Sequence, residues 1–313
     1  VVGVTAMTLT LIDVAKTVRL VKEVDERIRV VVGGPHAHIY PQETLGIPGV
    51  DLVVLGEGEQ TFKELLDRLG HPARLREVKG LVFREDGQLV NTGAPELIED
   101  LDALPFPARH LTPYGKYSSL LARRAPVTTL FTSRGCPYRC SFCDRPNLGK
   151  RFRWRSAGNV VDEMEECVNL GIREFLVYDD TFTVNRQRVL DICDEIIRRK
   201  LDIGWDIRTR VDRVDEEMLR RLRRAHCERI HYGIEAGTEK ILQVLQKDIT
   251  LEQVRRTFAL TKEAGIATLA YFMIGSPMET REDVLETIRF MERLEPDFVH
   301  ITVLCPFPAT AIY

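Results

Sequence analysis

The chain has 313 residues, of which 44% are hydrophobic and 29% charged, and its formal net charge at pH 7 is −3. This composition excludes a fibrous or intrinsically disordered protein, and the charge gives no general attraction to nucleic acid or to an anionic membrane. No apolar run approaches the roughly 20 residues of a membrane-spanning helix. The length is sufficient for two domains, each with its own core.

Residues 1–75 alternate short apolar strands with helices. The pattern predicts helices over 11–24 and 60–69, and strands over 1–5, 28–32 and 50–55. Continuous apolar strands between helices are typical of a parallel sheet that is covered on both faces. Three such units form only part of a Rossmann-like sheet. We therefore expect the first strands of this domain to lie before Val1.

Residues 76–125 have a different character. Asp86-Gly87 separates two short β-prone runs and predicts a hairpin. The stretch 101–107 contains two prolines and disfavours regular structure. We interpret 76–125 as a linker between two domains.

The alternation of strands and helices resumes over residues 126–313. Ser156, the pair Thr250 and Gln253, and Thr280 mark helix starts. Strands are predicted over 127–132, 173–179, 203–207, 228–234, 267–274 and 298–304. Six βα repeats predict an open (β/α)6 partial TIM barrel, C-terminally truncated here, whose chemistry lies at the carboxyl ends of its strands.

Three of the seven cysteines, Cys136, Cys140 and Cys143, follow the first strand of the predicted barrel with C-x3-C-x2-C spacing. Clustered cysteines indicate metal binding and a reducing cytoplasm rather than disulfides. Three thiolates can hold three irons of a [4Fe-4S] cluster, which normally has four cysteine ligands, so one iron stays open. A zinc site is the alternative, but structural zinc requires four ligands, and the next candidates are Cys167 and His226.

This motif, with the aromatic Phe142 before its third cysteine, resembles that of the radical S-adenosylmethionine (SAM) superfamily. The resemblance implies that SAM chelates the open iron. An electron from the cluster then cleaves SAM to a 5′-deoxyadenosyl radical, and Phe142 lies near the adenine. It further implies an electron donor such as flavodoxin or ferredoxin.

Further positions resemble the SAM-binding residues of that superfamily. Asp179 or Asp180, after the second barrel strand, would meet the SAM amine; the alternative is an aspartate that caps a helix. Glu235, after the fourth strand, resembles the acidic residue near the SAM ribose or the substrate, or is a structural carboxylate. Arg210 and its neighbour Arg208 would meet the SAM carboxylate or a substrate anion, unless they pair with nearby aspartates.

Three other features remain after the strands are assigned. The turn 275–280 resembles a Gly-x-Pro-Gly-Glu-Thr turn of the superfamily, with Met278 in place of glycine. Cys305, after the sixth strand, is a weak candidate for a catalytic thiol, whereas Cys167 and Cys193 fall on apolar helix faces. The basic and aromatic run 150–155 is the one tract that could suggest RNA contact. Nucleic acid binding is not expected.

The first domain resembles the cobalamin-binding domain found ahead of many radical SAM proteins. The matching residues are Val2–Met7, Val31–His36 and Gly56–Glu59. The resemblance implies that the Thr5 hydroxyl meets the nucleotide tail of cobalamin, and that Gly33 and Gly34 allow the tail to lie close to the backbone.

The two resemblances together predict a cobalamin-dependent radical SAM enzyme that transfers a methyl group to an unactivated carbon of a small molecule. Its cofactors would be a [4Fe-4S] cluster, SAM and cobalamin. A cobalamin-containing cyclase or rearrangement enzyme is the nearest alternative, and a cluster-binding protein without catalysis is the alternative from another class. The first domain of a methylthiotransferase carries cluster cysteines of its own. No cysteine precedes Cys136 in this sequence, which disfavours that class of enzyme.

Overall fold

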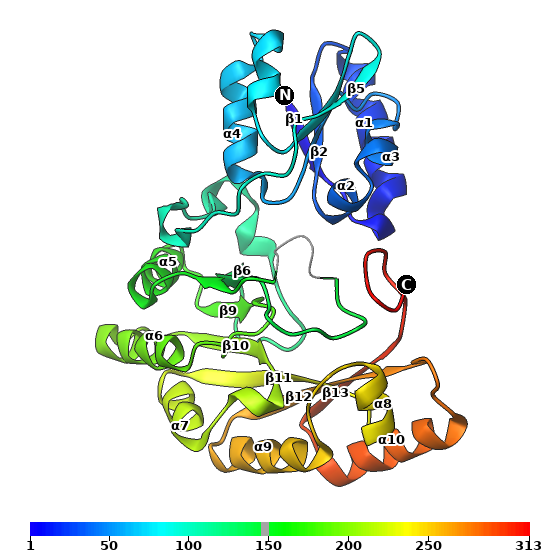
Figure 1. The fold of residues 1–313 in the computed structure, drawn as a ribbon. Helices are drawn as coiled ribbons and strands as arrows, with labels where there is room; N and C mark the ends of the chain where they lie inside the picture. The colour runs from blue at the N-terminus through cyan, green and yellow to red at the C-terminus, as the bar shows by residue number, and fades with distance from the viewer. Residues whose placement is uncertain (145–149) are drawn as a thin grey trace. The chain divides into compact units, whose positions relative to one another are not determined.

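The computed structural model describes residues 1–144 and 150–313 (Figure 1), and these form two compact units. One unit comprises Val1–Glu99 together with Asp144, and the other comprises Asp100–Cys143 and Lys150–Tyr313. Across these ranges, no helix has both the length and the apolar character needed to span a bilayer.

The first unit contains a five-stranded sheet in the order β1-β2-β3-β4-β5. The parallel strands are β1 (Val2–Thr5), β2 (Val30–Gly33) and β3 (Leu52–Val54). The antiparallel hairpin β4 (Leu81–Glu85) and β5 (Gln88–Asn91) extends the sheet beyond β3. The hairpin therefore belongs to the first sheet, although the sequence analysis assigned it to a linker. The reason is hydrophobic burial, since Leu81, Val82 and Phe83 are all buried in the two cores of this unit.

Helices cover this sheet on both faces, as predicted. One core contains Val30 and Val32 with Val14 and Val18 of α1 (Leu11–Val24), and the other contains Val31 with Leu65 of α4 (Gly58–Arg68). Two short helices were not predicted, and each begins at a proline in its first turn. They are α2 (Pro35–Ile39) and α3 (Pro41–Leu45). Short 3-10 helices occupy Thr8–Thr10 and Pro72–Glu77.

The second unit is built on a six-stranded, fully parallel sheet in the order β13-β12-β11-β10-β9-β6. Because β6 and β13 remain edges, the curled sheet is an open partial barrel, which confirms the predicted fold class. Its strands are β6 (Val127–Leu130), β9 (Glu174–Val177), β10 (Gly204–Thr209), β11 (Cys227–Glu235), β12 (Ala267–Ile274) and β13 (Phe298–Val303).

Helices connect these strands, two of them (α8 and α9) between β11 and β12, and Figure 1 shows α5, α6, α7 and α9 along the outside of the sheet. Ser156 caps α5 by accepting a hydrogen bond from Asn159 N, and the predicted capping box begins α9. A second capping box begins α10 at Thr280, the predicted helix start. The core between sheet and helices includes the fully buried Trp205 and Phe175. The helices are α5 (Ala157–Asn169), α6 (Arg186–Arg199), α7 (Glu216–Arg224), α8 (Glu239–Val244), α9 (Leu251–Glu263) and α10 (Arg281–Leu294).

Smaller elements surround the cysteine loop. The strands β7 (Ser133–Arg134) and β8 (Arg153–Trp154) pair antiparallel, so the chain before the cysteines is joined to the chain that follows them. Short 3-10 turns lie at Leu101–Ala103, Arg109–Leu111, Tyr114–Lys116 and Val211–Arg213.

Candidate cluster and cofactor sites

The three motif cysteines lie in the loop that follows β6, at the carboxyl end of the parallel sheet. Cys136 is buried, Cys140 is half-buried and Cys143 is exposed. The Cys136 sulfur lies 3.7 Å from the Thr181 hydroxyl, which follows β9. Ser141 fastens the loop to the end of α8, because its backbone N–H donates to Leu245 O at 3.0 Å.

The donor set fits an iron–sulfur cluster, since thiolates are its ordinary protein ligands. Among the described residues, no three His, Cys, Asp or Glu side chains converge in the way that would hold a single metal ion. Cys136, Cys140 and Cys143 would each bind a different iron of the cluster.

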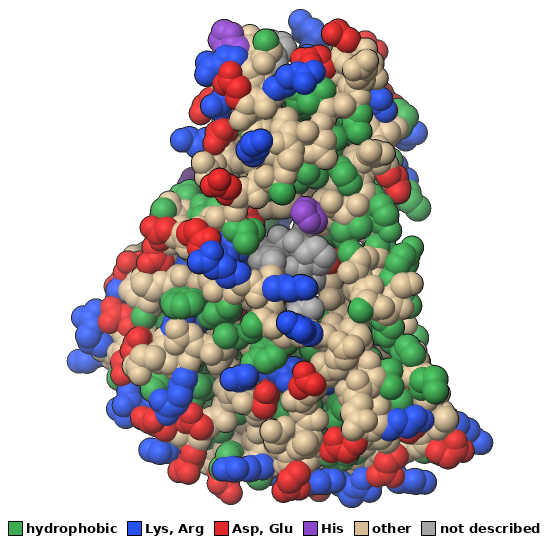
Figure 2. All heavy atoms as spheres, viewed as in Figure 1, with side chains coloured by type: hydrophobic (Ala, Val, Ile, Leu, Met, Phe, Trp, Pro, Cys, Tyr) green, Lys and Arg blue, Asp and Glu red, His purple; other side chains and the backbone are tan. Residues whose placement is uncertain are grey.

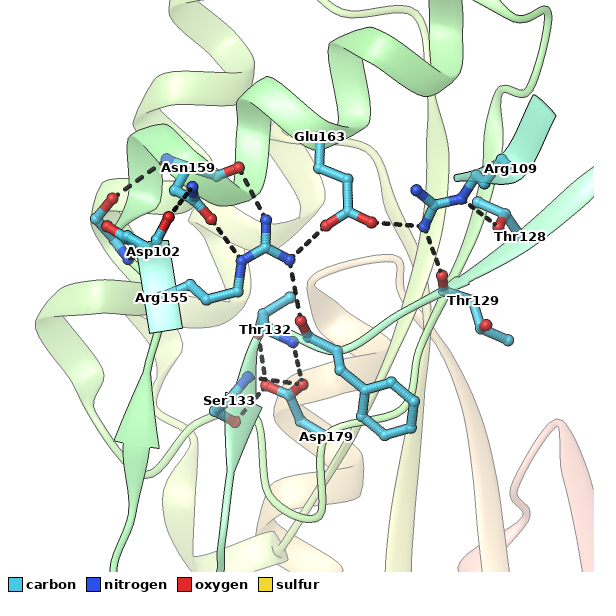
Figure 3. A network of polar contacts seen from close by, with 12 residues as sticks. Asp102, Arg109, Thr128, Thr129, Thr132, Ser133, Arg155, Asn159, Glu163 and Asp179 are labelled. Carbon is cyan, nitrogen blue, oxygen red and sulfur yellow. Dashed lines mark hydrogen bonds and ion pairs between the residues drawn. The ribbon is translucent and has the colours of Figure 1, made fainter. Parts of the chain in front are cut away.

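Asp179 anchors the start of this loop (Figure 3). Its carboxylate accepts four hydrogen bonds, from Thr132 N at 2.6 Å, Ser133 N at 3.1 Å and both hydroxyls at 2.5 Å. The buried Arg188 guanidinium lies 3.7 Å away. Because both carboxylate oxygens are fully engaged, the structure places Asp179 as a support of the loop and leaves it no free acceptor for the SAM amine.

The neighbouring Asp180 has the opposite environment. It is exposed, and its carboxylate has no hydrogen bond or ion pair with any residue of the described ranges. Partial desolvation, and then the charge of Asp179, raise the pKa of Asp180. An ammonium group nearby would stabilise its charged form. Of the two aspartates, Asp180 is therefore the one that remains a candidate for the SAM amine.

A buried ion cluster supports the preceding strand. Glu163 of α5 accepts from Arg109 Nη2 at 2.6 Å and also from Arg155 Nη1. Arg109 Nη2 also donates to Thr129 O, and Arg155 Nη1 donates to Phe131 O, both at 3.1 Å (Figure 3). Since β6 is an edge strand, these outward carbonyls have no neighbouring strand to pair with. The two arginines take the place of that strand. This cluster was not predicted from the sequence, because Arg109 lies 54 residues before Glu163 along the chain.

Arg210 lies beside the second motif cysteine. Its Nη1 group is 3.9 Å from the Cys140 sulfur, and its guanidinium lies over the Tyr138 ring at 4.1 Å from the centroid. Nε donates to Asp212 at 2.8 Å and Nη2 donates to Lys247 O at 2.6 Å. The SAM contact predicted for Arg210 remains a prediction, but most of its donors are already engaged within the protein.

Glu235 forms a buried ion pair with Lys247 at 2.7 Å. Lys247 also lies 5.9 Å from the centre of the Phe142 ring. Burial raises the pKa of the Cys140 thiol, and the charges of Lys247 and Arg210 oppose that effect. Lys247 was missed by the sequence analysis, because nothing in the run around it distinguishes a buried lysine from a solvated one. Glu235 retains its predicted place at the carboxyl end of β11, now with a defined partner.

Arg208 has different contact partners from Arg210. It donates to Val177 O at 2.7 Å, stacks on Tyr178 at 3.6 Å and lies 3.6 Å from Asp206. Of the two arginines, Arg210 therefore contacts the cysteine loop, whereas Arg208 contacts the end of β9.

The turn after β12 is held in a defined conformation with methionine at the position where the resemblance implied glycine. Met278 adopts a left-handed backbone conformation, with φ of 62°, and is exposed. The Glu279 carboxylate accepts from Gly275 N at 2.5 Å and Ser276 N at 3.1 Å. These two hydrogen bonds hold the turn with methionine in the position where the superfamily uses glycine.

The remaining cysteines are divided between core and surface. Cys167 and Cys193 are buried on α5 and α6, as predicted, and burial raises their pKa values to about 11 and about 12. Cys305 is exposed after β13. No contact of the described residues joins it to the motif cysteines, so its catalytic role remains a prediction.

In the first unit, the predicted cobalamin residues meet at the carboxyl edge of the sheet, where Thr5 and Gly33 are direct register partners. Thr5 is exposed, and its hydroxyl has no hydrogen-bond partner in the described part of the chain. A Cβ on Gly33 would make only ordinary contacts with Val54, the nearest at 3.6 Å. Gly33 and Thr5 therefore present an open edge that fits a ligand lying along the backbone.

Gly34 has a different reason to be glycine. Its φ is +96°, and a Cβ would lie 2.9 Å from Ala6 O and from the Thr5 side chain. The close approach that requires glycine here is made by the protein's own β1 end. A role toward cobalamin stays a prediction for this residue.

The basic run after the cysteine loop is not a solvated strip, because Arg153 and Arg155 are buried. On the face shown in Figure 2, Lys and Arg side chains are interspersed with Asp and Glu. Neither observation favours a nucleic acid partner.

Comparison with known proteins identifies the class to which this fold and site belong. The family model of the radical SAM superfamily matches residues 130–291, and the chain belongs to this superfamily. A B12 binding domain model matches residues 1–66, which confirms the predicted nature of the first domain.

Among curated relatives, an uncharacterised methyltransferase of Pyrococcus horikoshii is 36% identical over 316 residues, covering all of this chain and 68% of the relative. An anaerobic magnesium-protoporphyrin IX monomethyl ester cyclase of Rubrivivax gelatinosus is 32% identical, again over the whole chain and over 58% of the relative. The chain thus spans between about half and two thirds of the length of the curated relatives that it matches.

Two solved structures share the fold. The radical SAM methyltransferase TsrM of Kitasatospora setae superposes with a TM-score of 0.82 at 22% identity, over 99% of this chain and 63% of TsrM. The cobalamin-dependent SAM radical enzyme OxsB gives 0.80 at 22% identity, over 94% of this chain and 43% of OxsB.

Proposed function

We propose that this chain is the cofactor-binding part of a cobalamin-dependent radical SAM methyltransferase that acts on an unactivated carbon of a small molecule. The observation that carries the proposal is the loop with Cys136, Cys140 and Cys143 at the carboxyl end of the open parallel sheet, in a chain that also has a B12 binding domain. We further propose a cytoplasmic location and an electron donor such as flavodoxin or ferredoxin.

Within this proposal, the protein binds and orients its cofactors while the cofactors supply the reactive chemistry. When bound, the cluster and SAM supply a radical that removes a substrate hydrogen, and cobalamin supplies the methyl group. The three motif cysteines hold the cluster, Asp180 binds the SAM amine, and Phe142 lies against the adenine. Thr5 and Gly33 hold the cobalamin tail along the edge of the first sheet.

Glu235 has a more restricted role. Because Lys247 already neutralises its charge, Glu235 acts toward the SAM ribose as a hydrogen-bond acceptor in a fixed position rather than as a free anion.

A cyclase is the second candidate, and one observation favours it. The magnesium-protoporphyrin ester cyclase of Rubrivivax gelatinosus matches this chain over its whole length at 32% identity, close to the value for the methyltransferase relative. Both candidates use the same site residues. The product distinguishes them, since methyl transfer moves a labelled methyl group from SAM to the substrate and cyclisation does not.

The first experiment is anaerobic reconstitution of the full-length protein, followed by quantification of iron, sulfide and cobalamin. We expect about four irons per chain and one bound cobalamin. Addition of dithionite and SAM should yield 5′-deoxyadenosine. Cys136→Ala should lose the cluster, whereas the matched control Cys305→Ser should keep it, because Cys305 is exposed outside the motif.

Each outcome has a distinct meaning. A cluster without cobalamin would contradict the methyltransferase proposal. A cluster that does not cleave SAM would favour a binding protein without catalysis. Zinc in place of iron would overturn the proposal as a whole.

A further inference from the structure

Arg210 is the cationic side chain that the described structure aims at a motif sulfur. We propose that Arg210 sets the reduction potential of the cluster by donating a hydrogen bond from Nη1 to the Cys140 sulfur. This inference rests on the proposed function, because it requires that Cys140 ligate a cluster.

The guanidinium is held in one orientation by contacts on several sides. Nε and Nη2 are bound to Asp212, at 2.8 and 3.4 Å, and Nη2 also donates to Lys247 O at 2.6 Å and to Asp248 O at 3.4 Å. The Tyr138 ring covers the flat face of the group. Nη1 is left to point at Cys140, with a nitrogen-to-sulfur distance of 3.9 Å.

The contacts that hold Arg210 in this orientation all come from the protein itself. Arg210 is buried, and Tyr138 and Cys140 belong to the loop that it contacts. The side chain therefore has little freedom to turn toward a soluble ligand. Its remaining donor group is better placed for a cluster sulfur than for the SAM carboxylate.

The direction of the electrostatic effect follows from charge. Reduction adds an electron to a cluster that already bears thiolate charge, and a hydrogen bond from a cation to a ligating sulfur favours the reduced state. Asp212 offsets part of the Arg210 charge, and Glu235 offsets that of Lys247. Among the described residues, Arg210 Nη1 is nevertheless the charged group with a hydrogen bond to the Cys140 sulfur.

The test is a redox titration of the reconstituted full-length protein, followed by electron paramagnetic resonance of the reduced cluster. Arg210→Gln should lower the equilibrium constant for reduction about tenfold, which is a shift of about 59 mV to more negative potential for a one-electron couple. Arg210→Lys should show a smaller shift in the same direction, because an ammonium keeps the charge but cannot bridge Asp212, Lys247 O and Cys140 together.

Arg213→Gln is the matched control. Arg213 also lies near Asp212, at 3.7 Å, and over Tyr138, at 5.3 Å from its centre, but it is half exposed and has no contact with Cys140. Removing its charge should shift the reduction potential by only a small fraction of the shift caused by Arg210→Gln. SAM affinity, measured by the change that SAM causes in the resonance spectrum, should be retained in all three variants.

Two results would overturn the inference. An unchanged potential in Arg210→Lys and Arg210→Gln, together with a loss of SAM affinity, would assign Arg210 to SAM binding. Equal shifts in Arg210→Gln and Arg213→Gln would show a general charge effect rather than a directed hydrogen bond. If wild-type protein itself assembled no cluster, the proposed function would fail first, and iron analysis would show that separately.

Discussion

Different contacts hold the carboxyl ends of the strands in the two sheets of this protein. In the first unit, the ends of β1 and β2 are joined by backbone contacts: Ala6 N donates to Gly33 O at 2.8 Å and His36 N donates to Ala6 O at 3.0 Å. In the second unit, buried carboxylates hold the end of β6 and the loop after it. The first edge is therefore held by close packing of the backbone itself. At the edge strand β6, side chains take the place of the missing neighbouring strand.

Among the substitutions that test this comparison, Asp179→Ala should cause the largest loss of stability. It removes the acceptor of four hydrogen bonds and leaves the buried Arg188 without its carboxylate, so we expect a loss of about 3–5 kcal/mol in the free energy of unfolding. Denaturant unfolding of the cofactor-free protein measures this. The adjacent Asp180→Ala is the control and should change stability by less than about 0.5 kcal/mol, while weakening SAM binding. Equal losses in both variants would contradict the separate roles.

Glu163→Gln should cause the second largest loss of stability. The amide retains the shape of the side chain but leaves Arg109 and Arg155 as buried cations, and we expect a loss of about 3 kcal/mol in stability. A matched surface change is Glu217→Gln, whose partner Arg186 is half exposed; there we expect less than about 1 kcal/mol. Glu163→Gln should also reduce iron retention after gel filtration, because the arginines hold the base of the cysteine loop. Normal iron retention would show that β6 needs no such support.

Gly34→Ala should have an intermediate effect in the first unit. The added methyl group would approach Ala6 O too closely at a positive φ, so we expect a loss of about 1–3 kcal/mol in stability. Gly33→Ala is the neighbouring control, where the methyl group has room. It should leave stability nearly unchanged and lower cobalamin affinity, as measured by absorbance titration. If Gly33→Ala retained full affinity, the predicted contact between the cobalamin tail and this backbone would be wrong.

Cys305→Ser should have the smallest effect. The side chain is exposed, so the free energy of unfolding should stay within about 0.5 kcal/mol of wild type, and cluster content should be unchanged. Turnover then decides the one role that the sequence suggested for Cys305. A loss of product with normal SAM cleavage would assign it to catalysis.

Much of the fold could be predicted because it depends on local patterns. The helix over 11–24, the strand over 267–274 and the caps at Ser156, Thr250 and Thr280 follow from periodicity and capping chemistry, and all are present. The hairpin around Asp86-Gly87 was predicted too, but not its sheet. A hairpin sequence specifies its own turn, whereas pairing with β3 depends on apolar side chains distant in the chain.

The candidate site divides in the same way. The cysteine spacing is a local signal, and it predicts the cluster loop that the structure places after β6. The partners of each polar side chain are not local, so the sequence could not separate Asp179 from Asp180, or Arg208 from Arg210. Asp179 binds Thr132 whereas Asp180 faces solvent, and Arg208 stacks on Tyr178 whereas Arg210 contacts Cys140. These contacts depend on the folded structure and not on the local sequence.

The turn after β12 bears on how such proteins are recognised. Its shape depends on two backbone N–H groups that converge on the Glu279 carboxylate, and Met278 accepts the left-handed conformation at a cost of about 1–2 kcal/mol. A methionine is therefore compatible with this turn when the glutamate binds the two N–H groups. A motif search that insists on the glycine would overlook chains of this kind, whereas one that follows the glutamate would retain them.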